Sequence, residues 1–311
     1  MITSVFIGSS AYALPALKTM CLQDAKPLLV VSQPDKPAGR NLHPQPTPVS
    51  VYAKEQHLPL FTPGTINEPE SIVAISKVRP DILISASYGG FLGKELRKLA
   101  PYRAVNLHPS LLPKFRGASP IQSALLNGVT ITGNTIFRLV AQMDAGPIIS
   151  QQTLNILDNE NFSSLHNRLA DQAAEMLMTL LNNPALLSGE QAQITEQATW
   201  CPMIDSSLCQ ISWKNPAEAI HNKIRAFSLS PGAWTFYRGN KLKLLGALLT
   251  GTASAGEPGT INNIEKNTGF TVNCLDNQIL VTLVQAAGKK VMDAAAYANG
   301  ARLVSGEKLW M

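Results

Sequence analysis

Short apolar runs alternate with helical patterns over the first 157 residues, and this alternation limits the possible folds more than any other feature of the chain. The runs are almost continuously apolar, which is typical of strands buried on both faces of a sheet. They lie at Ile2–Ile7, Leu28–Val31, Ile82–Ala86 and Ala104–Asn106. Helical patterns separate them, at about 11–22, 49–56, 68–77, 92–99 and 119–127. The sequence therefore predicts an α/β domain with a doubly wound, mostly parallel, Rossmann-like sheet, and 131–139 and 148–157 add strands at one edge.

The pattern changes beyond a long helix that is predicted over about 163–181, where apolar side chains recur at helical spacing. Periodicity is lost between Asn182 and Trp200, which is typical of a linker. One helix near 216–227 and several short strands follow, at 234–237, 241–249, 258–262, 270–274 and 279–285. Short strands of this kind predict a small OB-like β-barrel. We therefore expect a first domain at 1–182, a linker at 183–204 and a β-barrel domain at 205–311.

Composition excludes several classes of protein. The chain has 311 residues, of which 45% are hydrophobic and 15% charged, as in a folded two-domain protein rather than a disordered one. No apolar run reaches the ~18–20 residues of a transmembrane helix, and the N-terminus lacks the features of a signal peptide. The four cysteines form no C-x-x-C pair, so we expect buried thiols in the reducing cytoplasm and no metal site.

The positive charge is concentrated near the C-terminus. Residues 1–200 carry 15 Lys and Arg against 14 Asp and Glu, whereas residues 201–311 carry 11 against 7. Because fixed cations gain free energy by releasing counterions from phosphates, this excess suggests a polyanionic partner; a solubilising surface is the alternative.

Familiar catalytic signatures are missing from the chain. It contains no G-x-G-x-x-G, G-x-x-x-x-G-K-[ST], H-E-x-x-H or G-x-S-x-G motif. Kinases, zinc proteases and ordinary serine hydrolases therefore receive no support from the sequence.

The stretch from Asn106 to Pro113 is the most informative one. It follows a central strand, at the edge where open α/β sheets hold their ligands. Residues two apart on an extended chain point to the same side, so Asn106 and His108 can share one cleft. An amide and an imidazole suit a reaction in which a carbonyl oxygen gains negative charge. A structural histidine capping a strand end is the alternative for His108.

Asp144 is the second candidate, since it follows an apolar strand and has no basic residue within five positions. A carboxylate in such surroundings needs a donor, and an imidazole at a neighbouring strand end can serve. The alternative is an ordinary turn aspartate preceding Gly146.

Taken together, these motifs resemble those of the methionyl-tRNA formyltransferases along nearly the whole chain. The N-x-H-x-S-L-L-P stretch at 106–113 resembles the signature of enzymes that use 10-formyltetrahydrofolate, and 116–121 resembles its usual continuation. Two stretches narrow the resemblance to the tRNA enzymes: the loop at 33–40 and the G-K-K motif at 288–292. Residues 224–227 resemble the motif that opens the family's C-terminal domain.

The resemblance implies that Asn106, His108 and Asp144 are the catalytic residues. The implied reaction transfers a formyl group from 10-formyltetrahydrofolate, as co-substrate, to the α-amino group of methionyl-initiator tRNA for translation initiation. In that role Asn106 donates to the oxyanion, His108 stabilises it or passes a proton to the leaving nitrogen, and Asp144 positions the imidazole.

The resemblance also implies two binding sites. The folate site is expected to be lined by Ser110, Leu111, Leu112, Pro113, Tyr88 and Gly89. The cations expected to contact tRNA are Arg40, Lys241, Lys243, Lys289 and Lys290, unless these lysines only form a scattered, solvated surface. A cytoplasmic monomer with no metal and no membrane partner is expected.

Three other functions fit some of the same residues. A formyltransferase acting on an amino sugar nucleotide keeps the three catalytic residues but has no use for the loop at 33–40. Hydrolysis of 10-formyltetrahydrofolate by water fits the same residues. A nucleic-acid-binding protein on an inactive scaffold does not explain why all three are retained.

Overall fold

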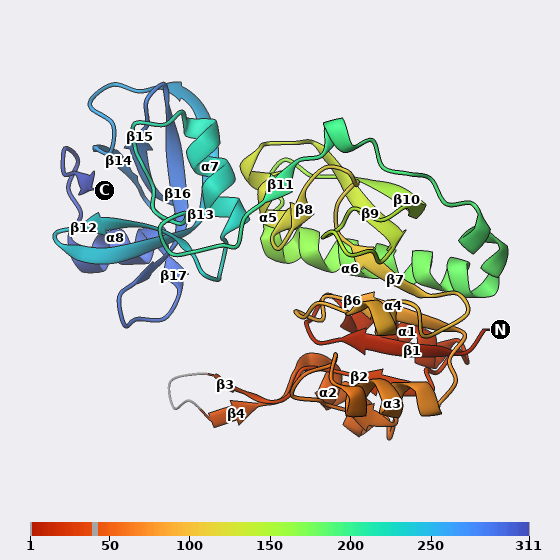
Figure 1. Ribbon diagram of the computed structural model, residues 1–311. Helices are drawn as coiled ribbons and strands as arrows, with labels where there is room; N and C mark the ends of the chain where they lie inside the picture. Colours follow the sequence, from red (N-terminus) through yellow and green to blue (C-terminus); the bar gives the residue numbers. More distant parts are fainter. Residues whose placement is uncertain (1, 39–42, 311) are drawn as a thin grey trace. The chain divides into compact units, whose positions relative to one another are not determined.

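The computed structural model describes residues 2–38 and 43–310, which divide into two compact units (Figure 1). The N-terminal unit contains the chain up to Gly117, Ile131–Asn155 and His166–Cys201. The C-terminal unit contains Ala118–Thr130, Ile156–Leu165 and the chain from Pro202 onward. Arg40, a predicted tRNA contact, lies outside the described residues.

The N-terminal unit is built on a seven-stranded sheet of order β10-β9-β7-β6-β1-β2-β5. Five of these strands are parallel, and β9 and β10 add to one edge in antiparallel fashion. Their bounds are β1 Ser4–Gly8, β2 Leu29–Val31, β5 Leu60–Phe61, β6 Ile82–Ala86, β7 Ala104–His108, β9 Ile131–Arg138 and β10 Ile148–Asn155. Figure 1 shows β1, in red, between β6 and β2. The predicted α/β fold class is confirmed, including the two added edge strands.

Helices connect the parallel strands, as the β-α-β alternation predicts. They are α1 Leu14–Leu22, α2 Pro48–Glu55, α3 Pro69–Lys77 and α4 Lys94–Arg97, and the long α6 Phe162–Asn182 follows β10. Proline stands in the first turn of α1, α2 and α3, where its missing N–H costs nothing. The side chain of Thr47 caps α2 by accepting a hydrogen bond from Ser50 N. None of the helices in the described residues is long and apolar enough to span a bilayer.

The C-terminal unit is a curled antiparallel sheet of order β14-β15-β16-β13-β12-β18, with β17 paired to β16. The strands are β12 Ala233–Tyr237, β13 Asn240–Ala253, β14 Ile261–Glu265, β15 Gly269–Asn273, β16 Asn277–Ala286, β17 Met292–Asp293 and β18 Leu309–Trp310. Backbone hydrogen bonds join its two ends: Ile261 N donates to Glu307 O, and Leu309 N donates to Gly259 O, each at 2.8 Å. These bonds curl the sheet toward closure, in agreement with the predicted OB-like barrel.

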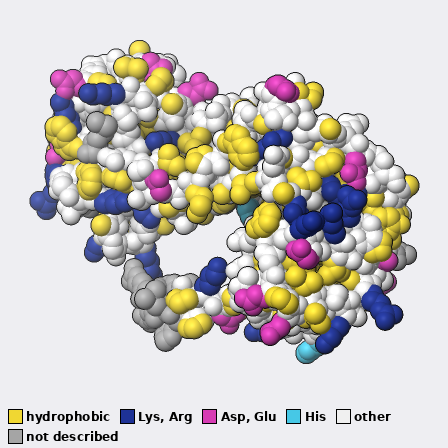
Figure 2. All heavy atoms as spheres, viewed as in Figure 1, with side chains coloured by type: hydrophobic (Ala, Val, Ile, Leu, Met, Phe, Trp, Pro, Cys, Tyr) yellow, Lys and Arg dark blue, Asp and Glu magenta, His cyan; other side chains and the backbone are white. Residues whose placement is uncertain are grey.

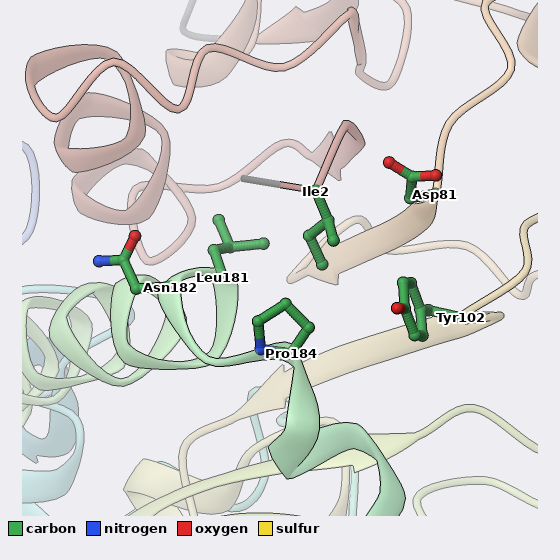
Figure 3. Close-up of a pocket in the computed structure, with 6 residues that line it drawn as sticks. All are labelled: Ile2, Asp81, Tyr102, Leu181, Asn182 and Pro184. Atoms are coloured by element: carbon green, nitrogen blue, oxygen red, sulfur yellow. The ribbon is translucent and has the colours of Figure 1, made fainter.

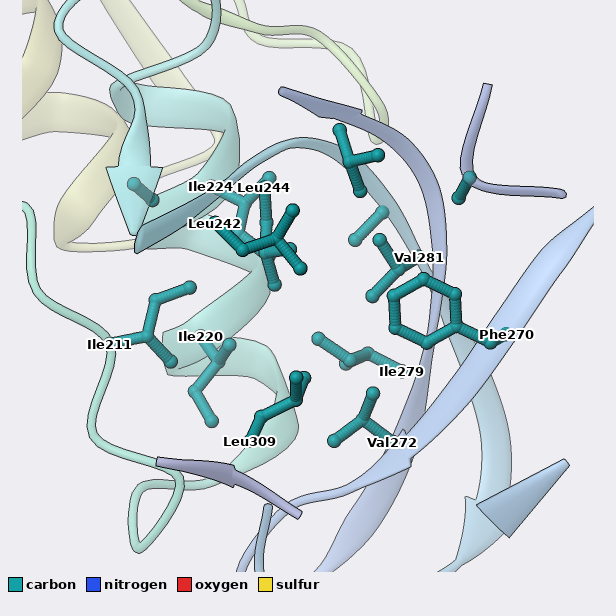
Figure 4. Close-up of a cluster of buried hydrophobic side chains, with 14 of the residues drawn as sticks. Ile211, Ile220, Ile224, Leu242, Leu244, Phe270, Val272, Ile279, Val281 and Leu309 are labelled. Atoms are coloured by element: carbon teal, nitrogen blue, oxygen red, sulfur yellow. The ribbon is translucent and has the colours of Figure 1, made fainter. Parts of the chain in front are cut away.

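Alternate residues of these strands fill the barrel interior (Figure 4). Leu242 and Leu244 of β13 point inward and meet Ile220 and Ile224 of α7 (Ala217–Ala226). Each such fully buried aliphatic side chain contributes ~1.5–3 kcal/mol relative to an exposed one. The other helices of this unit are α5 Pro120–Leu126 and α8 Ala294–Ala301.

The segment at 183–204, which the sequence predicts as a linker, contains short ordered elements. Two 3₁₀ turns lie in it, at Pro184–Ser188 and Thr195–Gln197, and β11 (Trp200–Cys201) pairs with β8 (Arg116–Gly117). Glu190 forms an ion pair with Arg138, a residue 6% exposed. Side-chain and two-residue pairings of this kind have no periodic signal, so the sequence alone does not indicate them. A second short pairing is the hairpin of β3 (Lys36–Ala38) and β4 (His43–Gln45).

Candidate active site

Asn106 and His108 lie at the carboxyl end of β7, between β6 and β9. In register, Asn106 lies beside Ser85 of β6, and His108 lies beside Thr135 of β9. The two side chains share one side of the strand because they are two residues apart. Asn106 is partly exposed, whereas His108 is only 5% exposed and meets the ring of Phe137 edge-on at 6.2 Å. A buried imidazole thus stands beside an accessible amide at the edge where such sheets bind ligands.

The Asp144 carboxylate lies next to the His108 ring. Asp144 Oδ2 is 3.8 Å from His108 Nδ1, and His108 Nε2 is 3.0 Å from the carbonyl oxygen of Phe115. Since a carbonyl only accepts, Nε2 donates in that hydrogen bond. Asp144 Oδ2 also accepts a 2.8 Å hydrogen bond from Gly117 N. An imidazolium formed during a reaction therefore has an oxygen in front of each nitrogen.

The backbone of the turn carrying Asp144 is held in an unusual conformation. The φ angle of Asp144 is +50°, in the left-handed region that aspartate enters more readily than most residues. A Cβ at Gly146 would lie 1.7 Å from the carbonyl oxygen of Arg138, so only glycine fits there. The turn therefore packs too tightly against β9 to shift freely, which fixes the position of the carboxylate.

Gln193 supports the same turn, although the sequence analysis did not identify it. Its Nε2 donates to the carbonyl oxygens of Asp144 and Gly146, at 2.8 and 2.7 Å. Its Oε1 accepts from Arg116 Nε and Nη2, at 3.1 and 2.6 Å. Gln193 lies in the segment that the sequence indicated as a linker, and nothing in a single sequence marks such a contact.

The loop after His108 is held from inside by Thr135. Thr135 Oγ1 donates to the carbonyl oxygen of Ser110 at 2.6 Å and accepts from Leu112 N at 3.1 Å. Gln151 Nε2 donates to the carbonyl oxygen of Leu112 at 2.8 Å. Ser110 Oγ donates to the carbonyl oxygen of Lys114, so this hydroxyl forms its hydrogen bond within the loop. Ser110 and Leu112 are buried, which leaves Leu111 and Pro113 as the partly exposed members of the predicted folate loop.

Tyr88 and Gly89 follow β6, the neighbour of β7. The Tyr88 ring is 3% exposed and belongs to a core cluster with Val5 and Ile7, and burial raises the pKa of its hydroxyl. Gly89 is exposed and has a φ of +79°, which suits glycine. Of these two candidates for folate contact, Gly89 is thus the accessible one.

The four predicted lysines lie on one part of the barrel. Lys243 pairs with Gln285 across β13 and β16, and the Gln285 side chain donates to the carbonyl oxygen of Lys289. Lys241 O accepts a hydrogen bond from Ala287 N, in the turn that carries Lys289 and Lys290. Both of these turn lysines are exposed.

A separate cavity of about 440 Å³ opens at the amino ends of the strands of the N-terminal sheet, opposite to the carboxyl ends that carry His108 (Figure 3). It is lined by Ile2, Asp81, Tyr102, Leu181, Asn182 and Pro184. Ile2 precedes β1, and Asp81 precedes β6. The cavity therefore lies at the amino ends of the parallel strands, away from His108 and Asp144. Across the described ranges, no group of three His, Cys, Asp or Glu side chains is arranged to hold a metal ion.

Comparisons with known proteins agree on one family. Residues 5–181 match the formyl transferase family, and residues 203–302 match the formyl transferase C-terminal domain. The methionyl-tRNA formyltransferase of Thermotoga neapolitana is 40% identical over 308 residues, covering 98% of this chain and 97% of the relative. That of Thermotoga maritima is 38% identical, covering 97% and 96%.

A solved structure shares the fold at much lower identity. The N-formyltransferase from Helicobacter canadensis, in complex with folinic acid and dTDP-3-aminofucose, has a TM-score of 0.64 and 18% identity. The match covers 92% of this chain and 100% of that one.

Proposed function

This chain belongs to the methionyl-tRNA formyltransferase family, and from that premise we propose that it formylates the α-amino group of methionyl-initiator tRNA with 10-formyltetrahydrofolate as donor. A bond forms between the methionine nitrogen and the formyl carbon, and the bond between that carbon and the folate nitrogen breaks. The proton lost by the amine ends on the leaving nitrogen. The product, N-formylmethionyl-tRNA, serves translation initiation.

One observation supports the chemistry: the imidazole of His108 lies 3.8 Å from the carboxylate of Asp144 at the carboxyl end of β7, and the partly exposed Asn106 lies two residues before His108 on the same strand. When the amine attacks, the formyl oxygen gains negative charge, and a preformed donor stabilises it. The Asn106 side chain makes no hydrogen bond within the part of the chain that the structure describes, so its amide is available to donate. A donor of this kind typically contributes ~10²–10³ in turnover.

His108 acts in this proposal as the group that holds or moves the proton. Its Nε2–H is engaged with the carbonyl oxygen of Phe115, so Nδ1, which faces Asp144, is the nitrogen left to bind a further proton. Asp144 in turn is fixed by Gly117 N and by the turn that Gln193 supports. The carboxylate therefore stabilises the imidazolium without moving.

Residues of the 110–113 loop and Gly89 supply the proposed contacts to the pteridine ring of the donor. A flat polar ring needs fixed backbone donors and acceptors at its edge and apolar atoms at its face. Thr135 and Gln151 fix the backbone of the loop, whose carbonyl oxygens each keep a second lone pair for a ligand, while Leu111 and Pro113 remain partly exposed. A donor bound there supplies the activated one-carbon unit.

The C-terminal unit supplies the proposed tRNA contacts, through the cluster of Lys241, Lys243, Lys289 and Lys290. Its charge excess is that of a phosphate-binding surface. Arg40 stays a candidate contact on sequence grounds alone. A substrate of translation places the reaction in the cytoplasm, and a monomer suffices for it.

The decisive assay offers 10-formyltetrahydrofolate with four acceptors in turn: methionyl-initiator tRNA, methionyl-elongator tRNA, an amino sugar nucleotide, and water alone. We expect formylation of the initiator tRNA only. Formylation of the sugar, or release of folate without any acceptor, would overturn the proposal in favour of the corresponding alternative.

A further inference from the structure

The outer surface of the barrel carries aromatic and cationic side chains in adjacent positions. Phe236 of β12 pairs directly with Lys241 of β13 on one side and with Trp310 of β18 on the other. Trp234 of β12 pairs with Lys243 of β13. Directly paired residues of antiparallel strands point to the same face, so these five residues form one surface, which we call the aromatic face.

Most of the aromatic face lies outside the barrel core, although Trp234 is partly buried and packs against it. The residues that alternate with it, Leu242, Leu244 and Leu309, point into the interior (Figure 4). Trp310 is 57% exposed, although tryptophan side chains are usually largely buried. Figure 2 shows hydrophobic side chains interspersed with basic and acidic ones over the surface of this unit. The large aromatic ring of Trp310 is thus presented to solvent at the edge of the sheet.

Two lysines lie against the rings of this face. Lys241 Nζ is 4.0 Å from the centre of the Trp234 ring, well within cation–π range. The rings of Trp234 and Phe236 meet edge-to-face at 5.4 Å, which fixes both side chains. Lys308 Nζ lies 5.8 Å from the Trp310 ring, but it also pairs with Glu257. The charge available to a ligand therefore comes mainly from Lys241 and Lys243.

We propose that the aromatic face binds unpaired nucleotides of the tRNA, with a base stacked on Trp310 and the adjoining phosphates held by Lys241 and Lys243. Exposed aromatic rings next to a line of cations are the combination that single-stranded nucleic acid recognises, because every base has a stacking face. A duplex does not fit as well, since its base faces are already stacked on each other. This inference rests on the proposed tRNA substrate and adds the part of the tRNA that the barrel contacts.

The first test measures binding of uncharged initiator tRNA to the full-length chain over a range of salt concentrations. Trp310→Ala is expected to weaken binding about 5- to 100-fold and to leave the salt dependence unchanged, because stacking releases no counterions. Trp310→Phe is expected to restore most of the affinity. Lys241→Gln and Lys243→Gln are each expected to flatten the log–log salt slope by about 0.7, the value for single strands.

The matched control is Leu249→Ala, which removes an exposed apolar side chain from β13, the strand of Lys241 and Lys243, outside the aromatic face. It is expected to bind tRNA as the original chain does. The pairing of β18 with β12 uses backbone groups, so Trp310→Ala is expected to keep the sheet intact. Equal melting temperatures of Trp310→Ala and Leu249→Ala would confirm this.

A second test separates this inference from the proposed function. A 12-nucleotide single-stranded RNA and its duplex are titrated while tryptophan fluorescence is followed, with Trp310→Phe as reference. Quenching by the single strand that is absent in Trp310→Phe supports the inference. Equal binding of single strand and duplex, or an unchanged affinity in Trp310→Ala, overturns it while formylation of initiator tRNA still stands. Quenching without any formylation of tRNA instead overturns the proposed function.

Discussion

The carboxyl edge of the N-terminal sheet and the outer face of the barrel present functional side chains in opposite ways. At the sheet edge, His108 is 5% exposed and is held with Asp144 by contacts from two other segments of the chain, 115–117 and Gln193. On the barrel, Lys241 and Lys243 extend outward from β13 and Trp310 from β18, the two strands that flank β12. The first arrangement provides fixed geometry for a reaction, and the second provides area and charge for holding a large substrate.

The two regions should accordingly fail in different ways. Changes at the sheet edge are expected to lower kcat and leave tRNA affinity intact, whereas changes on the barrel are expected to lower affinity and leave kcat intact. A variant that breaks this division would show that the two regions do not act separately.

The largest effect is expected from His108→Ala. Loss of the imidazole removes the proton-transfer group, so kcat should fall about 10²–10⁴-fold. The measurement is steady-state formylation of methionyl-initiator tRNA together with direct tRNA binding. Near-normal turnover in this variant would show that the site lies elsewhere, and a parallel loss of tRNA binding would contradict the division between the two regions.

A smaller effect on kcat is expected from Gln193→Ala, because it removes the two hydrogen bonds that hold the Asp144 turn. We expect a loss of about 10- to 100-fold in kcat with an unchanged KM for tRNA, since misplacement of a catalytic group costs that much. Gln191→Ala is the matched control, because the exposed Gln191 contacts β10 through its backbone alone. A general loss of stability that lowers kcat and raises KM together would mean that Gln193 has only a structural role.

The double variant Lys289→Gln, Lys290→Gln tests whether these two exposed lysines of the barrel contact tRNA. If both lysines contact phosphates of a tRNA duplex, binding weakens and the log–log salt slope falls by about 0.9 per lost contact. Formylation at saturating tRNA should proceed at the original rate. Lys266→Gln, at another exposed turn of the same unit, is the control. A salt slope that stays the same would remove these two lysines from the tRNA-binding surface.

The smallest effect concerns the stability of the barrel in acid. Hydrogen bonds from Tyr237, Arg238 and Val304 N lower the pKa of Glu307 from its ordinary 4.5 to about 2. Because the folded-state pKa is lowered, this contribution is complete above pH 4.5 and is lost as the pH falls toward 2.

Thermal unfolding of Glu307→Gln measures this contribution. We expect the variant to melt a few degrees below the original chain at pH 6 and to approach it as the pH falls toward 2. A difference that stays constant with pH would mean that the carboxylate contributes through shape rather than charge.

Much of this architecture could be predicted from the sequence. The continuous apolar run at 82–86 predicts a buried strand, and apolar side chains at helical spacing predict the long helix over 162–182. Asn106, His108 and Asp144 were identifiable because their chemistry and their places after strands agree. Their catalytic roles stay predictions until the variants above are measured.

The rest lacks a local signal. β8 and β11 are two residues each and pair across more than eighty positions. The helix at Ala294–Ala301 is nearly all small residues, so it has no polar face that would mark it. Gln193 supports the Asp144 turn only because the fold brings it there, and an isolated glutamine in a polar segment looks like any other.

The division into two units also has a consequence for how such a chain can be rearranged. The polypeptide passes between the units five times, because Ala118–Thr130 and Ile156–Leu165 belong to the C-terminal one. No single cut releases either unit whole, and grafting this barrel onto another enzyme would leave behind α5 and the start of α6. Because the two units are interleaved along the chain, we expect sequence changes within each unit to be tolerated more readily than exchange of one unit for another.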